Sequence, residues 1–154
     1  MSLTSGGILA WRREKGVLKV LLVHPGGPFF IKKDEGAWSI PKGAGEEGEG
    51  MLTAARREFA EELGMEITGD FIALAPVKQK GGKVVYAWAV ETNSDVRAFK
   101  SNTFSMEWPP RSGKMQEFPE VDMAEWFAVD EAKKKINAAQ VAFIDELAGK
   151  TGGI

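Results

Sequence analysis

Residues 43–65 read GAGEEGEGMLTAARREFAEELGM, and this stretch predicts a helix that carries a cluster of acids. Its apolar residues recur at helical spacing, which predicts one face packed on a core: Leu52, Ala55, Phe59 and Leu63. Gly64 follows directly and is a typical helix stop, because glycine readily adopts the left-handed cap conformation.

Three glutamates of this stretch share one face of the predicted helix. Glu58, Glu61 and Glu62 are spaced at i, i+3 and i+4, which brings their carboxylates together. Like charges at this spacing destabilise a helix by about 0.2–0.5 kcal/mol per pair. Carboxylate oxygens grouped in this way suit a hard divalent ion such as Mg²⁺. The alternative is a solvated acidic surface, which is the commoner meaning of an acidic run.

The spacing of the whole stretch favours the metal site, because it resembles the Nudix box of the Nudix hydrolases. The family pattern is Gly, five residues, Glu, seven residues, then Arg-Glu-bulky-x-Glu-Glu-x-Gly-bulky. Every fixed position is filled at the correct spacing, by Gly43, Glu49, Arg57, Glu58, Phe59, Glu61, Glu62, Gly64 and Met65. Such a complete match is far more specific than a lone glycine-rich motif. Phe59 is a mild departure, since that position is usually aliphatic in the family.

The resemblance implies a metal centre. Glu58, Glu61 and Glu62, with the backbone carbonyl of Gly43, would bind Mg²⁺, for which Mn²⁺ could substitute. Arg57 would orient the carboxylates through charge-assisted pairs, so the implied catalytic set is Arg57, Glu58, Glu61 and Glu62.

Two further roles follow from the resemblance. Glu49 would be an auxiliary ligand or a hydrogen-bond partner. The general base is open between Glu58 and three acids of a later loop, Glu107, Glu117 and Glu120, because a base must come within reach of the attacking water.

The implied reaction is Mg²⁺-dependent hydrolysis of a pyrophosphate bond in a nucleoside diphosphate linked to a group X. Candidate substrates are dinucleoside polyphosphates, nucleoside triphosphates, nucleoside diphosphate sugars and ADP-ribose. Residues 38–43 (WSIPKG) resemble the segment before the box in the diadenosine-tetraphosphate-hydrolase branch, which ranks dinucleoside polyphosphates first. A non-catalytic Nudix module that senses a nucleotide is the other alternative, although a pure binder does not need this full set of glutamates.

Composition predicts one globular domain over residues 1–154, with an ordered core over residues 3–149. The chain is 44% hydrophobic and 27% charged, with a formal net charge of −2, and the acidic box stands in a mildly basic frame. A duplex nucleic-acid binder would instead show a broad basic stripe. The absence of cysteine excludes disulfides and thiolate metal sites. Without a signal-type or membrane-length apolar run, we expect a cytoplasmic monomer or homodimer that binds a small nucleotide and contacts no membrane.

The remaining pattern predicts an α/β fold with a mixed sheet between helices. We expect hairpin turns at residues 13–16 and 79–83, a short strand over residues 38–43, and a helix over residues 129–147 with Asp130 as N-cap. The longer strands are predicted over residues 4–13, 17–24, 71–78, 84–91 and 123–128. Together with the resemblance, this order implies a Nudix-type α/β/α sandwich.

Residues 93–122 show no regular period and predict a long, functional loop. With Lys42 beside the box, this loop supplies the predicted substrate-binding residues Arg111, Lys114 and Glu117. The alternative is an insertion that only covers a sheet edge.

Three side chains outside the box have two interpretations each. His24, the single histidine, is expected to be structural rather than catalytic. Phe29 and Phe30 either join the core, which we favour, or stack on a base.

Overall fold

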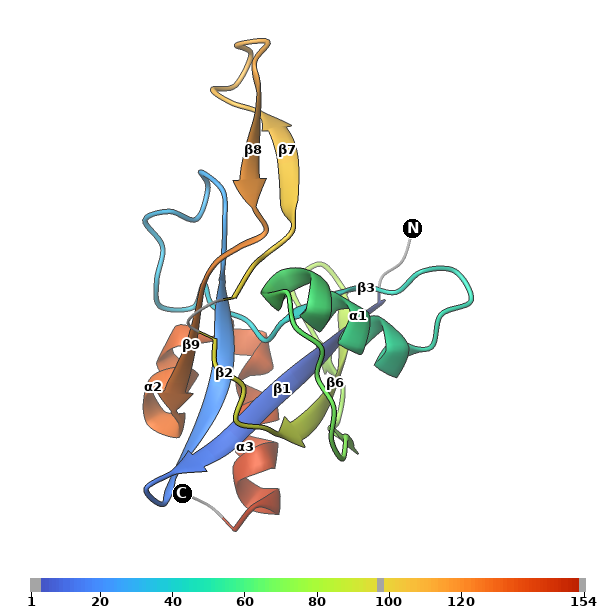
Figure 1. Cartoon of the computed structure of the whole chain (residues 1–154), viewed down its shortest axis with the longest axis vertical. Coiled ribbons are helices and arrows are strands. Elements are labelled where there is room, and N and C mark those ends of the chain that lie inside the picture. Colours follow the sequence, from blue (N-terminus) through green and yellow to red (C-terminus); the bar gives the residue numbers. More distant parts are fainter. Residues whose placement is uncertain (1–3, 97–98, 153–154) are drawn as a thin grey trace.

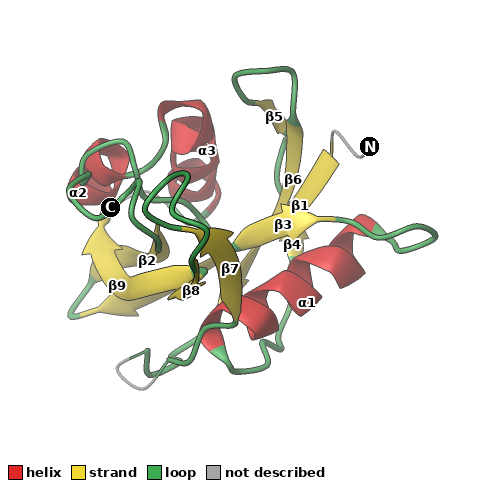
Figure 2. Cartoon of the chain, turned by 90° about the horizontal axis from the view of Figure 1, so that it is seen from above, coloured by secondary structure: helices red, strands yellow, loops and turns green. Residues whose placement is uncertain are grey.

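The structure, a computed structural model, describes residues 4–96 and 99–152. A mixed sheet has helices on both faces, as predicted. Figure 2 shows α1 (Met51–Leu63) on one side of the sheet, with α2 (Val129–Lys135) and α3 (Val141–Lys150) on the other. None of the helices in these described ranges is long and apolar enough to cross a membrane.

The central strand of the sheet is β1 (Thr4–Glu14), which runs parallel to β6 (Val84–Glu91) and antiparallel to its other partners. Its hairpin to β2 turns at Lys15 and Gly16, whose φ values of 53° and 81° are those that a two-residue turn of this kind requires. Within the described residues the strand order is β4 (Ile72–Ala73), β6, β1, β2 (Val17–Pro25) and β9 (Val121–Ala128), while β3 (Lys42–Ala44) pairs with β1 and β5 (Val77–Lys78) pairs with β6.

Strands β1 and β2 diverge after their hairpin, and the chain that leads into the box lies between them. The second half of β1 pairs with β2, but residues 5–7 of β1 pair with β3 instead. On the other side of the gap, Val23 of β2 exchanges two backbone hydrogen bonds with Ser39. Residues 39–44 therefore connect the two diverging strands.

Two buried clusters fill the layers on either side of the sheet. Strand β2 contributes to both, with Leu22 in one and Leu21 in the other, as is typical of a strand with a nearly continuous apolar run. One face of β6, formed by the smaller side chains of Val85, Ala87 and Ala89, packs in the layer of α3. It shares a buried cluster with Phe143, Ile144 and Leu147. The predicted apolar stripe of α1 packs in the other layer, with Leu52 only partly buried: Ala55, Phe59 and Leu63.

The predicted continuous helix over residues 129–147 is wrong. It is interrupted after Lys135 by an extended Ile136 with ψ 149°, followed by the 3-10 helix η1 (Ala138–Gln140) and then α3. The side chain of Asn137 accepts a hydrogen bond from the Ala139 N–H and so begins the new helical segment. Asp130 is also not the N-cap, because Ala128 occupies that position.

The predicted strand over residues 71–78 consists of the two short strands β4 and β5. Pro76 lies between them and has no N–H to donate to a ladder. The N–H of Ala75 donates to the Glu146 side chain of α3 rather than to another strand.

The predicted irregular loop over residues 93–122 contains a hairpin, and only residues 97–98 of it lie outside the described part. Strand β7 (Thr103–Glu107) pairs with β8 (Met115–Pro119), and β9 begins at Val121 rather than Met123. Figure 1 shows this hairpin projecting beyond the main sheet. The prediction failed because both strands are only five residues long and mostly exposed, so the alternation of Phe104 and Met106 in β7 is too short to stand out and β8 shows none.

Gly64 ends α1 in the left-handed conformation, with φ 69°, and a Cβ there would lie 2.6 Å from the Lys100 carbonyl oxygen. We expect Gly64→Ala to lower the free energy of unfolding through both backbone strain and overlap. Gly81 has φ 89° and open space around it, so Gly81→Ala measures the strain alone. In chemical denaturation the Gly64 variant should lose at least about 1 kcal/mol more than the Gly81 variant. Equal losses would show that Lys100 does not restrict this position.

Candidate active site

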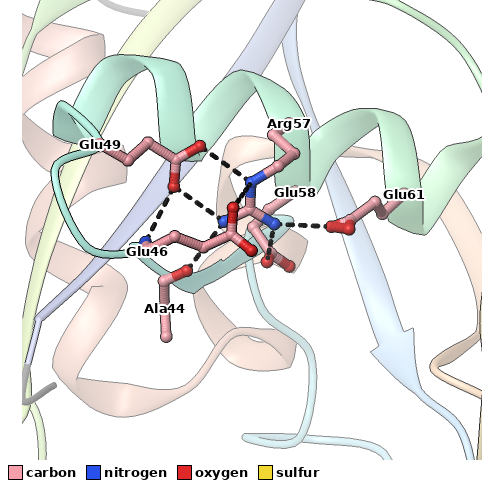
Figure 3. Close-up of polar contacts among 6 residues, drawn as sticks. All are labelled: Ala44, Glu46, Glu49, Arg57, Glu58 and Glu61. Atoms are coloured by element: carbon pink, nitrogen blue, oxygen red, sulfur yellow. Dashed lines mark hydrogen bonds and ion pairs between the residues drawn. The ribbon is translucent and has the colours of Figure 1, made fainter. Parts of the chain in front are cut away.

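Arg57 lies at the centre of the acidic box and binds both the loop and the helix. Its Nε and Nη2 donate to the two carboxylate oxygens of Glu49 at 2.9 and 3.0 Å, and Nη2 also donates to the Ala44 carbonyl at 3.0 Å. Its Nη1 donates to Glu58 at 2.9 Å and to Glu61 at 2.8 Å (Figure 3). The hydrogen bonds from Arg57 hold the pKa of Glu49 below its usual value. One guanidinium therefore ties residues 44–49 to α1.

Gly43 permits a close approach between the incoming chain and the helix. A Cβ at this position would overlap the Glu58 carboxyl group, so a larger residue cannot fit without moving that side chain. The Glu58 side chain is only 15% exposed, and burial raises its pKa despite the hydrogen bond from Arg57; the charges of Glu61 and Glu120 raise it further.

Glu62 points to the interior rather than to Arg57, and it is only 8% exposed. Burial raises its pKa to about 8, and the negative charges of Glu58 and Glu120 contribute to the rise. The charge and the backbone of Lys42 oppose this shift without cancelling it. The pKa of Lys42 is itself lowered, first by burial and then by the charge of Lys83.

Glu62 and Lys42 line a cavity of about 190 Å³ beside the end of β2. Glu120, which lies between β8 and β9, reaches the same cavity from the far end of the chain. The lining residues are Val23, Pro25, Ser39, Ile40, Lys42, Glu62, Glu120 and Val121. The structure thus brings α1, the chain before the box and the start of β9 to one place.

The three late acids named as possible bases have different surroundings. Glu120 lines the cavity with Glu62. The Glu107 carboxylate accepts hydrogen bonds from the backbone N–H groups of Arg111 at 3.2 Å and Gly113 at 2.9 Å, so it closes the turn of the hairpin. Glu117 lies on β8 and accepts a 2.9 Å hydrogen bond from the Thr103 hydroxyl. Only Glu120 stands at the cavity.

The predicted substrate-binding residues are also divided. Lys42 lines the cavity, whereas Arg111 and Lys114 lie in the turn of the projecting hairpin and Glu117 lies along its second strand (Figure 1). A role for these three hairpin residues in binding substrate stays a prediction.

The carboxylates of the box fit a divalent cation chemically, although they are not gathered around one point. Among residues 4–96 and 99–152, no three or more His, Cys, Asp or Glu side chains are arranged to hold a metal ion. Glu58 and Glu61 turn to Arg57, and Glu62 turns inward. Even so, the negative charges of Glu58 and Glu120 raise the pKa of the buried Glu62, and a hard cation with oxygen ligands would relieve that repulsion.

His24 and the two phenylalanines of the following loop lie apart from this cluster. The buried His24 ring has Nδ1 2.7 Å from an Asp122 oxygen and Nε2 2.7 Å from the Lys33 carbonyl, which is consistent with the structural role we expected. The core interpretation is wrong for Phe29 and Phe30, which are 59% and 36% exposed. Phe29 packs edge-on against Trp108, with ring centroids 5.5 Å apart.

Comparison with known proteins gives the same family as the box. The sequence model of the NUDIX domain matches residues 3–147. Nudix hydrolase 7 of Arabidopsis thaliana is 30% identical over 105 residues, which make up 63% of this chain and 36% of that protein. The chain therefore spans about a third of the length of this curated relative.

Solved structures of Nudix proteins share the fold. A binary complex of Ap4A hydrolase from C. elegans has a TM-score of 0.69 at 18% identity, covering 97% of this chain and 99% of that one. The NUDIX domain of Shewanella oneidensis NrtR, complexed with ADP ribose, has a TM-score of 0.64 at 17% identity, covering 98% and 88%. At such low identity these likenesses show the fold alone.

The raised pKa of Glu62 predicts a specific dependence of stability on pH. Between its ordinary value of 4.5 and about 8, the folded protein binds a proton that the unfolded chain has lost, so the free energy of unfolding falls as pH rises through this window. Glu62→Gln removes the ionisation. In metal-free buffer we expect its Tm to match the wild type near pH 5 and to exceed it by at least about 3 °C above pH 8.

The matched control is Glu47→Gln, which changes an exposed acid of the same box. Its Tm should follow the wild type at every pH. Parallel curves for Glu62→Gln and wild type would contradict the buried, proton-binding state of Glu62.

Proposed function

The chain belongs to the Nudix hydrolase family, and on that premise we propose that it is a Mg²⁺-dependent hydrolase of a pyrophosphate bond in a nucleoside diphosphate linked to a further group. One observation carries the proposal: the buried Glu62 carboxyl, which lies near Glu58, lines the same cavity as Lys42 and Glu120. A cation near these acids and a lysine beside them suit a substrate made of linked phosphates.

The proposed ligands are the carboxylates of Glu58, Glu61 and Glu62 with the Gly43 carbonyl. When bound, Mg²⁺, or Mn²⁺ in its place, supplies charge neutralisation at phosphate and a lower pKa for its water. Arg57 keeps Glu58 and Glu61 on one side of α1 while its bidentate pair with Glu49 holds the loop. The charge of Lys42 offsets the charge that develops on the leaving phosphate.

Glu120 is the proposed general base. It lines the cavity, and no hydrogen bond or ion pair engages its carboxylate in the described part of the chain. It is also exposed, so a water molecule can reach it. Glu58 is the second candidate, since its raised pKa shows a carboxylate that takes up a proton more readily than usual.

Dinucleoside polyphosphates are the substrates that we rank first. Two observations support this order: the WSIPKG segment before the box and the shared fold with a protein described as an Ap4A hydrolase. ADP-ribose and nucleoside diphosphate sugars are the next candidates, supported by the fold of a NUDIX domain complexed with ADP ribose. An assay that separates and identifies the hydrolysis products of each of these nucleotides, with Mg²⁺ present, chooses among them, because cleavage of a pyrophosphate bond in them leaves phosphate esters rather than free phosphate. Binding without turnover of any of them would favour the sensing module. A cytoplasmic location and a monomeric or dimeric state stay predictions.

The proposed metal role of Glu62 is tested by Glu62→Gln. The amide keeps the shape of the side chain but is a poor cation ligand, so kcat on the best nucleotide should fall at least ~100-fold, which corresponds to about 2.7 kcal/mol. Glu47→Gln is the control and should retain activity. A Glu62 variant that remains fully active would refute the role.

The assignment of the base is tested by Glu120→Gln. Loss of a general base should lower kcat by about 100-fold or more and remove the acidic limb of the pH–rate profile. Glu107→Gln is the control, because its carboxylate binds the hairpin turn away from the cavity. If Glu120→Gln keeps both kcat and the acidic limb, the base is not Glu120, and Glu58→Gln is examined next in the same assay.

A further inference from the structure

Gln140 is a fully buried polar residue outside the box. It ends η1, which connects α2 to α3, the two helices that lie opposite α1 (Figure 2). Its Oε1 accepts a hydrogen bond from the Ile40 N–H at 3.0 Å, and its Nε2 donates to Ser39 Oγ at 3.0 Å and to Gln79 Oε1 at 2.8 Å. These bonds engage the oxygen and both hydrogens of the amide. Because the Ile40 N–H needs an acceptor, the orientation of the amide is determined.

The contact with Ile40 closes a gap in the backbone pairing of residues 39–44. Ser39 is held by two backbone hydrogen bonds to Val23, of 3.0 and 2.9 Å, and β3 is held by its ladder with β1. Between them, the Pro41 carbonyl accepts from the Ile8 N–H at 3.1 Å, and proline has no N–H of its own. The Ile40 N–H is buried and is held by the side chain of Gln140.

The next two residues of this segment touch the carboxylates of the site. Lys42 lines the cavity with Glu62, and its charge and its backbone both act to lower the pKa of the Glu62 carboxyl group. Gly43 lies directly against the Glu58 carboxyl group. A displacement of residues 39–41 is therefore transmitted to both glutamates over one or two residues.

We propose that Gln140 is a positioning residue for the site: it fixes residues 39–41 so that Lys42 and Gly43 meet Glu62 and Glu58. This inference rests on the proposed function and adds to it a residue on the opposite side of the sheet. Without the amide, the Ile40 N–H is buried and unpaired, and the segment shifts to find water or another acceptor. Gln140 itself does not reach the reacting groups.

The test uses three variants of the full chain. Gln140→Met keeps the approximate shape and removes every hydrogen bond of the amide. Gln140→Glu keeps an acceptor for the Ile40 N–H. Gln79→Met is the matched control, because it removes only the bond of Gln140 that points away from residues 39–41.

Two readouts distinguish positioning from stability. In Gln140→Met, hydrogen exchange of the Ile40 amide should accelerate at least ~10-fold under conditions where the protein is folded. Its kcat/KM on the best nucleotide should fall about 10-fold, whereas Gln79→Met should stay within about 2-fold of wild type. When Lys42 is already replaced by alanine, adding Gln140→Met should lower kcat/KM by less than about 3-fold, because the effects of residues that act through one another are not additive.

The outcomes separate this inference from the proposed function. If the wild type hydrolyses a nucleotide but Gln140→Met, with its Ile40 amide exchanging fast, is equally active, the positioning role is refuted alone. Full additivity with Lys42→Ala refutes it as well. If Gln140→Met does not fold, Gln140→Glu decides: protected Ile40 with near-normal turnover supports the role, and protected Ile40 with lost turnover overturns it. A wild type that hydrolyses none of the nucleotides refutes the proposed function and this role with it.

Discussion

The guanidinium of Arg57 is the interaction on which the acidic site depends. It satisfies a loop carboxylate, a loop carbonyl and two helix carboxylates at once, with distances of 2.8–3.0 Å. Without this cation, the like charges on one face of α1 would repel one another with no partner nearby. The bidentate geometry with Glu49 also needs the planar fork of arginine, so lysine could not serve in the same way.

Burial divides the three glutamates of the helix into two kinds. Glu58 and Glu61 share a hydrogen-bonded cation, whereas Glu62 faces the interior and has its pKa raised to about 8. The adjacent positions 61 and 62 differ in this way because a helix turns about 100° per residue. In the box motif the three glutamates look equivalent. Only the packing of α1 on the sheet shows that Glu62 is the buried one, whose charge repulsion a bound cation would relieve most.

Strands β1 and β2 diverge, and residues 39–44, which lie between them, form part of the cavity wall. Residues 39–44 bond to β2 at one end and to β1 at the other. Gln140 supplies the bond that neither strand can give, from the helical layer on the far side of the sheet. The interruption of the last helix at Ile136 is part of the same arrangement, since Trp38 accepts from the Asn137 N–H and donates to the Lys135 carbonyl. A continuous helix would not place Gln140 beside Ile40.

The sequence alone determined the features that are local in the chain. The sequence pattern placed β1, β2 and β6 to within a residue and the end of α1 at Gly64, and the resemblance of the box implied that Arg57 pairs with its carboxylates, because these features depend on residues close together in the chain. Tertiary structure alone decided which distant groups join the site. Glu120 enters the cavity and Arg111 does not, because the hairpin of β7 and β8 carries its turn outward. Gln140 could not be recognised from the sequence pattern, since a glutamine in a helical stretch is ordinarily exposed. Its role here comes from its hydrogen bond with the Ile40 N–H, a hundred residues earlier in the chain.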